Sequence, residues 1–218
     1  MKKLRKFLHQ RLIKTYFWAA ELLYHDFAWA YDGVAWLVSF GFWSQLRLDS
    51  LQLLIPGPVL ETGFGTGSLL IEMNKRGLDV IGLELSPQMH RVTSRKNKRN
   101  KMTVRRVRGS TEAIPFPSST FANVLSTFPS QYVFSKETCK EVHRVLDQSG
   151  RWVIAGLGMQ FTSGIKQKLT NWIWGNYNND MVNLVREKME SAGFSSNIIF
   201  HETAQYIFPI LILTCEDG

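Results

Sequence analysis

The residues most informative about chemistry are three glycines at alternate positions in the segment Glu61-Thr62-Gly63-Phe64-Gly65-Thr66-Gly67. Alternating glycines let the backbone reverse tightly and let a ligand approach without a Cβ in the way, while a following helix presents free amide donors. A dinucleotide-binding turn needs a third glycine where this chain has Ser68, and a phosphate-binding P-loop needs a lysine that this segment lacks. The spacing therefore favours another ligand that contains a nucleoside.

Two acidic residues flank this turn and indicate the charge of the ligand. Glu61 directly precedes the glycines, where a carboxylate would repel a pyrophosphate but suits a ligand with an ammonium and a sulfonium. Glu84 ends a second β-rich run, where its two oxygens can accept hydrogen bonds from both hydroxyls of a ribose. Together they predict a site for a cationic nucleoside.

The elements around the turn must position these residues, and from residue 59 onward short β-rich runs alternate with helical patterns. Such alternation predicts an α/β fold with a Rossmann-like, doubly wound sheet covered by helices on both faces. Two closing runs are too near each other for a crossover helix, so they are expected to pair antiparallel. The predicted sheet is seven-stranded and mostly parallel with an antiparallel last strand. The expected strands are residues 58–61, 79–83, 103–107, 122–126, 151–155, 197–202 and 206–215.

Local patterns indicate where the helices begin and end. Ser86 and Pro87 suit the cap and the first turn of a helix, and a further helix is expected over residues 135–146. A helix over residues 180–192 should end at Gly193. Pro209 cannot donate a backbone hydrogen bond, so it predicts an edge position or a bulge in the last strand.

The length of 218 residues, with 44% hydrophobic and 20% charged residues, fits one compact domain. Residues 1–50 are expected to form an N-terminal helical cap within the same domain, over the site carried by residues 51–218. The longest apolar run is about half the roughly 20 residues of a spanning helix, and no cleavable signal is predicted. The two cysteines have no partners at metal-ligand spacing, so no metal site and a cytoplasmic location are expected.

These motifs resemble the class I S-adenosylmethionine-dependent methyltransferases, and within them the subgroup (methyltransferase type 11) of the ubiquinone and menaquinone C-methyltransferases. The resemblance extends over most of the chain and implies S-adenosyl-L-methionine as cofactor. The matching segments are Val59 to Gly67, Val80 to Met89, Gly109 to Phe116, and Glu141 to Leu146 with Gly150.

The resemblance also implies roles for individual residues. The turn would hold the methionine part of the cofactor, Glu84 the ribose, and Leu85 and Met89 the adenine face. Thr127, after the fourth strand, would border the reacting methyl group, and Tyr31 would face the cofactor carboxylate. The remaining positions that the resemblance assigns to the cofactor are Glu61, Thr62, Gly63, Gly65 and Gly67 in the turn, and Ser110, Thr111 and Glu112 at the adenine edge.

The chain departs from the family pattern at two places. Ser110 stands where the family usually has an acid that accepts from the adenine amino group, and a hydroxyl accepts more weakly than a carboxylate. A compensating contact from Glu112 is one way to restore affinity. The second departure, Ala122-Asn123, is predicted to be structural.

The methyl acceptor is predicted only as a class. Methyl transfer from a sulfonium can rest on positioning and exclusion of water, and a base is needed only if the acceptor loses a proton. Candidates for a catalytic group are His25, Tyr31 and Asp32, none with a partner in the sequence that proves a role. Aromatic residues suggest a pocket for a lipid, a quinone or another aromatic-like small molecule. These aromatic residues are Trp29, Trp36, Phe40 and Trp43 in the N-terminal segment, and Phe161, Trp172, Trp174 and Tyr177 further along.

Two alternatives remain open. The net charge of +8 and the basic run from Arg91 to Arg108 would suit a nucleic-acid substrate, although such runs are usually solvated helix faces, which disfavours nucleic acid. A non-catalytic module that binds a membrane or a partner would explain Ser110. The basic, aromatic N-terminus also leaves open a peripheral contact with the inner face of the membrane. The sequence does not indicate an oligomeric state.

Overall fold

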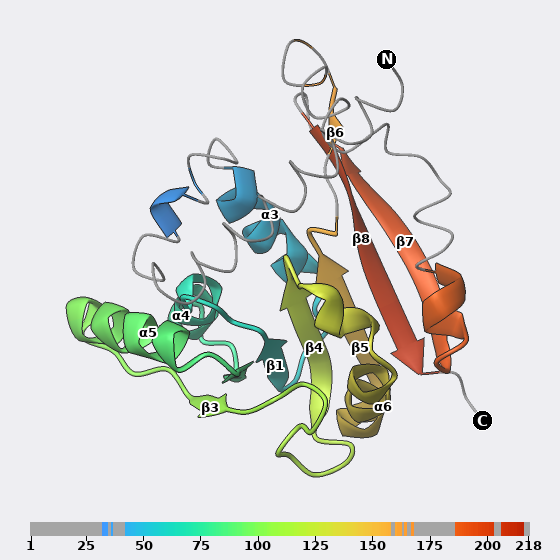
Figure 1. The fold of residues 1–218 in the computed structure, drawn as a ribbon, viewed down its shortest axis with the longest axis horizontal. Coiled ribbons are helices and arrows are strands. Elements are labelled where there is room, and N and C mark those ends of the chain that lie inside the picture. The colour runs from blue at the N-terminus through green and yellow to red at the C-terminus, as the bar shows by residue number, and fades with distance from the viewer. Residues whose placement is uncertain are drawn as a thin grey trace, which may run out of the picture.

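The computed structural model describes residues 32–34, 36, 42–157, 160–162, 164, 167, 186–202 and 206–215. Its centre is a twisted sheet with strands in the order β3-β2-β1-β4-β5-β8-β6, and β7 pairs with the other side of β8 along its length (Figure 1). The strands are β1 Val59–Thr62, β2 Val80–Glu84, β3 Arg106–Arg108, β4 Phe121–Thr127, β5 Leu146–Ala155, β6 Gln160–Phe161, β7 Phe194–Glu202 and β8 Tyr206–Cys215. The helices are α3 Phe42–Ser50, α4 Ser68–Lys75, α5 Pro87–Asn100 and α6 Lys136–Val145, with 3-10 turns at Leu51–Leu53 and Gln131–Phe134 and a helical segment at 186–190.

The predicted doubly wound, mostly parallel sheet is confirmed. Strands β1 to β5 pair in parallel and β8 runs antiparallel to both β5 and β7. The short strand β6 adds an eighth strand to the seven that were expected. Three strand boundaries were wrong. Strand β7 begins at Phe194 rather than at residue 197. Strand β3 begins at Arg106, after Val104 has already packed into the core, and β5 begins at Leu146, which pairs with Phe121 of β4.

Side chains alternate between two hydrophobic cores on opposite faces of the sheet, as the two-residue repeat of a strand requires. On β1, Val59 packs with residues of α3 and α4, whereas Leu60 packs with residues of α6. On β5, Val153 joins the first core and Trp152 the second. Helices therefore cover both faces, which leaves the carboxyl ends of the central strands as the place for a site (Figure 1).

The helix ends near this edge follow the predicted chemistry. The Ser86 hydroxyl accepts a hydrogen bond from the Met89 N–H at 3.3 Å, and Pro87 occupies the first helical position of α5. Ser135 caps α6 in the same way, through the Thr138 N–H. Gly193 follows the helical segment 186–190 with a φ of +87°, as expected for a glycine that ends a helix.

Buried polar residues fix the central strands to their surroundings. The Asn123 side chain accepts from the Ile55 N–H at 2.9 Å and donates to the Ile55 carbonyl at 2.8 Å, which confirms its predicted structural role. In β8, the pairing with β5 ends at Ile210 and the pairing with β6 begins at Ile207. Pro209 lies in this interval and, among the described strands, pairs only with Phe200 of β7, so the strand is locally an edge at the proline, as predicted.

Candidate active site

The glycine turn joins β1 to α4 at the carboxyl edge of the sheet. The Gly63 N–H donates to the Leu83 carbonyl of β2 at 2.7 Å, and the Gly67 N–H donates to the Phe64 carbonyl at 2.9 Å. Gly63, Gly65 and Gly67 have φ values of +65°, +53° and +72°, a backbone region that residues with a Cβ rarely adopt. The alternating glycines are therefore required by the shape of the turn.

The three glycines differ in the space around them. A Cβ on Gly67 would lie 2.6 Å from the Thr93 methyl group of α5, and one on Gly63 would lie 2.7 Å from the Tyr132 hydroxyl. A Cβ on Gly65 would meet no atom within 4 Å. Gly65 therefore borders open space in which a ligand can lie against the backbone.

This difference predicts separable effects of two substitutions. Gly65→Ala should lower the free energy of unfolding by only about 1 to 2 kcal/mol, because a left-handed backbone is its main cost. It should nevertheless weaken binding of S-adenosylhomocysteine strongly, since the methyl group enters the ligand's space. Gly67→Ala should destabilise by about 2 to 4 kcal/mol, because the clash with Thr93 adds to the strain. Urea unfolding and calorimetry measure the two effects; equal affinity of Gly65→Ala and wild type would contradict the expected position of the ligand.

Glu61 is buried at the start of the turn, and burial of its carboxyl group is only partly compensated. Its side chain is 2% exposed, and its Oε2 has no hydrogen-bond partner within the described part of the chain. Burial raises the pKa of Glu61 to about 8, while the positive charge of Arg47 opposes this rise and the nearby Glu84 adds to it. A buried carboxylate oxygen without a partner is costly unless a ligand supplies a donor, and an ammonium group would do so.

Glu84 holds the turn from the neighbouring strand. It is 3% exposed; its Oε2 accepts from the Gly65 N–H at 3.0 Å and its Oε1 accepts from the Ser86 N–H at 2.8 Å. Each oxygen of a carboxylate can accept more than one hydrogen bond, so these two backbone contacts are compatible with further hydrogen bonds from ribose hydroxyls. Glu84 thus links the shape of the turn to a candidate ligand contact.

The residues expected near adenine differ in how exposed they are. Leu85 is 62% exposed just beyond β2, whereas the Met89 side chain is completely buried and does not reach the surface of the site. The Ser110 hydroxyl accepts from the Glu112 N–H at 3.1 Å, and the Thr111 hydroxyl lies 3.1 Å from that of Thr138 on α6. Glu112 itself is exposed. Leu85 and the Ser110 turn are therefore the surfaces available to an adenine ring.

Phe128, which follows β4, and Trp43 of α3 form what we call the aromatic wall of the site. Thr127 is half-buried, and Phe128 follows it with a φ of +49°, which is rare for a bulky residue. The Phe128 ring stacks on Trp43 of α3 with 4.5 Å between ring centroids. Such strained residues occur preferentially at functional sites. The Tyr132 hydroxyl lies next to the turn and donates a hydrogen bond to the Thr62 carbonyl at 3.2 Å. Burial raises the pKa of Tyr132 to about 12.

Thr62 and Ser126 are structural neighbours of the site. Their hydroxyl oxygens are 2.6 Å apart in the buried sheet, and the Trp152 indole N–H donates to Ser126 at 2.9 Å. The line of contacts joins β1, β4 and β5 just beneath the turn. Both hydroxyls are buried, so Thr62 contributes to the site through its backbone carbonyl.

The candidates for a catalytic group are only partly placed. Asp32 lies beside the turn in contact with Thr66, Ser68 and Lys96. His25 and Tyr31 lie outside the described residues. Three residues from distant segments were not predicted. The positive charge of Arg47 acts on Glu61, Lys96 donates a hydrogen bond to the turn at Thr66, and Tyr132 donates one to the Thr62 carbonyl. Lys96 lies in a basic run that otherwise behaves as predicted, since most of its charges are exposed on the outer side of α5 and on β3.

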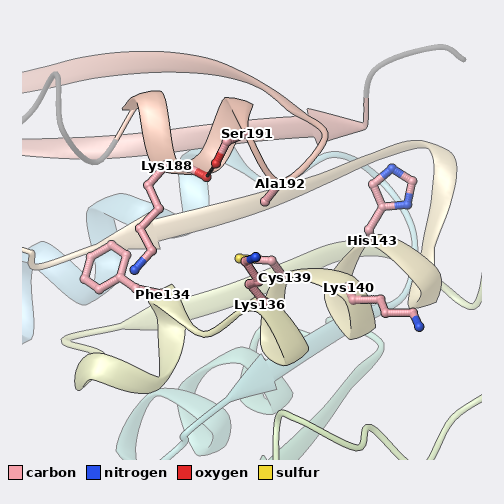
Figure 2. Close-up of a pocket in the computed structure, with 8 residues that line it drawn as sticks. All are labelled: Phe134, Lys136, Cys139, Lys140, His143, Lys188, Ser191 and Ala192. Atoms are coloured by element: carbon pink, nitrogen blue, oxygen red, sulfur yellow. Dashed lines mark hydrogen bonds between the residues drawn. The ribbon is translucent and has the colours of Figure 1, made fainter.

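A groove elsewhere on the molecule does not belong to this site. Figure 2 shows it between α6 and the segment 186–192, with a volume of about 510 Å³. The charged side chains that line it within the described part of the chain are all basic: Lys136, Lys140 and Lys188. None of the lining residues belongs to the glycine turn or its acidic partners.

Comparison with known families agrees with this geometry. Residues 59–150, from β1 into β5, match a family model described as a methyltransferase domain. A demethylmenaquinone methyltransferase of Thermus thermophilus is 28% identical over 138 residues, covering 61% of this chain and 63% of that protein. An uncharacterized methyltransferase of Bacillus subtilis is 30% identical over 115 residues, covering 51% and 62%. The chain thus spans less than two thirds of the length of these relatives.

Solved structures extend the likeness in fold. A putative S-adenosylmethionine-dependent methyltransferase from Methanococcus maripaludis has a TM-score of 0.61 at 15% identity, covering 86% of this chain and 93% of that one. A geranyl diphosphate C-methyltransferase from Streptomyces coelicolor has a TM-score of 0.57 at 14% identity, covering 81% and 79%. Residues 59–150 thus match a methyltransferase domain, and most of the chain shares the fold of these S-adenosylmethionine-dependent methyltransferases.

Proposed function

We propose that this protein transfers a methyl group from S-adenosylmethionine to a hydrophobic small molecule. The observation that carries the proposal is the Oε2 atom of Glu61, which is buried without a hydrogen-bond partner among the described residues, beside a glycine turn that donates to Glu84. Glu61 would accept from the ammonium of the methionine part, and Glu84 from the ribose. The open space at Gly65 accommodates the ligand between them.

The cofactor supplies the reactive methyl group, bound to a positively charged sulfur. The acceptor atom would gain the methyl carbon as the bond between carbon and sulfur breaks, S-adenosylhomocysteine would leave, and a proton lost by the acceptor would pass to water. The side chains of this protein contribute by aligning donor and acceptor and by excluding water. Neither Glu61 nor Glu84 needs to take a proton in this step.

The aromatic wall favours a flat, apolar acceptor. Phe128 and Trp43 stack beside the carboxyl end of β4, where Thr127 borders the proposed methyl position. Two relatives are named for quinone substrates, the demethylmenaquinone methyltransferase already described and a ubiquinone/menaquinone biosynthesis C-methyltransferase of Citrobacter koseri, 26% identical over 157 residues. A quinone, a lipid or another aromatic-like molecule is therefore the proposed acceptor class.

The aromatic residues expected around the pocket support this proposal unevenly. Phe161 is buried in the core and Trp36 is 61% exposed, although both were expected to line the pocket. Trp29, Phe40, Trp172, Trp174 and Tyr177 lie outside the described residues. Within residues 1–50, which we propose as a cap over the site, helix α3 contributes Trp43 to the wall and Leu46 to the core.

We also propose that the basic and aromatic N-terminus contacts the inner face of the membrane. Such a contact would give the protein access to an acceptor dissolved in the lipid. No helix in the described ranges is long and apolar enough to cross a bilayer.

The test combines binding with transfer of a labelled methyl group. Calorimetry of the purified protein with S-adenosylhomocysteine should show saturable binding, and labelled S-adenosylmethionine should deliver label to the organic phase of a cell extract. Label recovered in the RNA fraction would instead support the nucleic-acid alternative. Binding without transfer to any fraction would support a non-catalytic module, and absence of binding would reject the cofactor.

A further inference from the structure

The ammonium group of Lys96 joins three segments that are distant in the sequence. Lys96 lies on α5, and its Nζ donates to the Thr66 hydroxyl at 2.8 Å, to the Ser68 hydroxyl at 2.6 Å and to the Asp32 carboxylate. Thr66 is part of the glycine turn, Ser68 begins α4 and Asp32 belongs to the N-terminal segment. Each of the three ammonium donors therefore has an acceptor.

Asp32 completes the same cluster from the other side. Its Oδ1 accepts from the Thr66 hydroxyl at 2.6 Å, and its Oδ2 lies 3.4 Å from the Ser68 hydroxyl. The residue before α4 is Gly67, which has no side chain to cap the helix. A carboxylate at this end interacts favourably with the helix dipole. Asp32 thus stabilises the beginning of α4 as well as the turn.

The position of α5 is critical for the turn because the two are in close contact. A Cβ on Gly67 would overlap with Thr93, which lies one helical turn before Lys96 on the same helix. Two residues of α5 therefore contact the turn, Thr93 by packing and Lys96 by hydrogen bonds. A change in the Lys96 contacts should alter the turn directly.

The opposite charges of Asp32 and Lys96 stabilise each other in this cluster. Burial alone would raise the pKa of Asp32, but hydrogen bonds from Lys96 and Thr66 outweigh it and leave this pKa below its usual value. Burial lowers the pKa of Lys96, and Asp32 opposes that change. Asp32 is therefore the ion-pair partner of Lys96. With its lowered pKa it would be a weak base, which does not favour the catalytic role considered for it from the sequence.

We propose that Lys96 and Asp32 are positioning residues that fasten the N-terminal segment to the glycine turn and so set the affinity for the cofactor. This inference rests on the proposed function. The pair touches the turn through Thr66 and Ser68 and acts on the ligand through the turn's backbone. It should influence cofactor binding far more than the methyl-transfer step itself.

The test is a double-substitution cycle read by calorimetry with S-adenosylhomocysteine. Lys96→Met and Asp32→Asn should each weaken binding by about tenfold, and the double variant should bind no more weakly than Lys96→Met alone, because the two residues act together. Once an acceptor is available, the KM for S-adenosylmethionine should rise while kcat stays within about twofold. A large fall in kcat for Asp32→Asn would overturn the positioning role in favour of catalysis.

Lys98→Met is the matched control, since Lys98 is an exposed lysine two residues further along α5. It should bind as wild type does. Binding is measured well below the unfolding temperature of every variant, and if Lys96→Met does not fold, Asp32→Asn alone carries the test. If the wild type binds and Asp32→Asn, together with any folded Lys96→Met, binds with the same affinity, this inference is overturned and the proposed function stays intact. Absence of wild-type binding would overturn both.

Discussion

Binding of S-adenosylhomocysteine near pH 7 is expected to release close to one proton, and Glu61→Gln is expected to abolish that release. The pKa of Glu61 is raised to about 8 in the ligand-free protein, so its carboxyl group is mostly protonated at neutral pH. An ammonium placed against Oε2 favours the ionised form, and the proton must leave. Affinity should therefore rise by up to about tenfold per pH unit below pH 8 and level off above it.

The measurement is calorimetry in two buffers of different ionisation enthalpy. The difference in observed heat gives the number of protons released, and the Glu61→Gln variant serves as the control because it keeps the shape of the side chain without its charge. Wild-type binding without proton release would contradict the placement of the ammonium against Glu61.

The same carboxyl group should govern the stability of the ligand-free protein. The folded state holds the Glu61 proton up to about pH 8, whereas the unfolded state loses it near the ordinary glutamate pKa of 4.5. Between these values the folded state binds more protons, so the free energy of unfolding should fall as pH rises, by up to about 1.4 kcal/mol per pH unit from this group. Urea unfolding from pH 5 to 8 should show this slope in wild type and a flatter one in Glu61→Gln.

The second large effect is expected for Glu84→Ala, which should weaken binding of S-adenosylhomocysteine by at least about 100-fold. Hydrogen bonds to a charged group contribute about 1.5 to 3 kcal/mol each, and two ribose hydroxyls would lose this acceptor. The Gly65 and Ser86 N–H groups would also lose their partner, so the turn itself would relax. Both losses act in the same direction.

Glu72→Ala is the matched control for this substitution. Glu72 is a half-buried acid on α4 that pairs with Arg76, so its removal changes the net charge equally without touching the turn. Calorimetry should show affinity within about twofold of wild type for Glu72→Ala. If Glu84→Ala also bound like wild type, Glu84 could not be a ligand of the ribose.

The parts of the site that could be predicted from the sequence are those encoded locally. The glycine spacing, Glu61 and Glu84 lie within or next to two consecutive strands, and parallel strands bring their carboxyl ends to one edge. The cap at Ser86 and the end at Gly193 also depend on neighbouring residues. The positions of these features were predicted correctly because short-range geometry determines them, whereas the ligand contacts of Glu61 and Glu84 stay predictions.

The parts that were missed depend on tertiary packing. Lys96 differs from the other cations of its run only because its side of α5 faces the turn, and the pattern of charges alone did not distinguish it. Met89 was assigned to the adenine face, but the rotation of α5 buries its side chain completely. The extended start of β5 arises from pairing with β4, which no local preference at residues 146–150 indicates.

The arrangement of β8 has a consequence for the order of synthesis. This strand covers one edge of β5 and supplies the partner of β7, yet residues 206–215 leave the ribosome after every other strand of the sheet. Until then, β5 presents an open, apolar edge of the kind that pairs with other chains. Nascent or truncated chains that stop before residue 206 are therefore the forms of this protein that should most need chaperones.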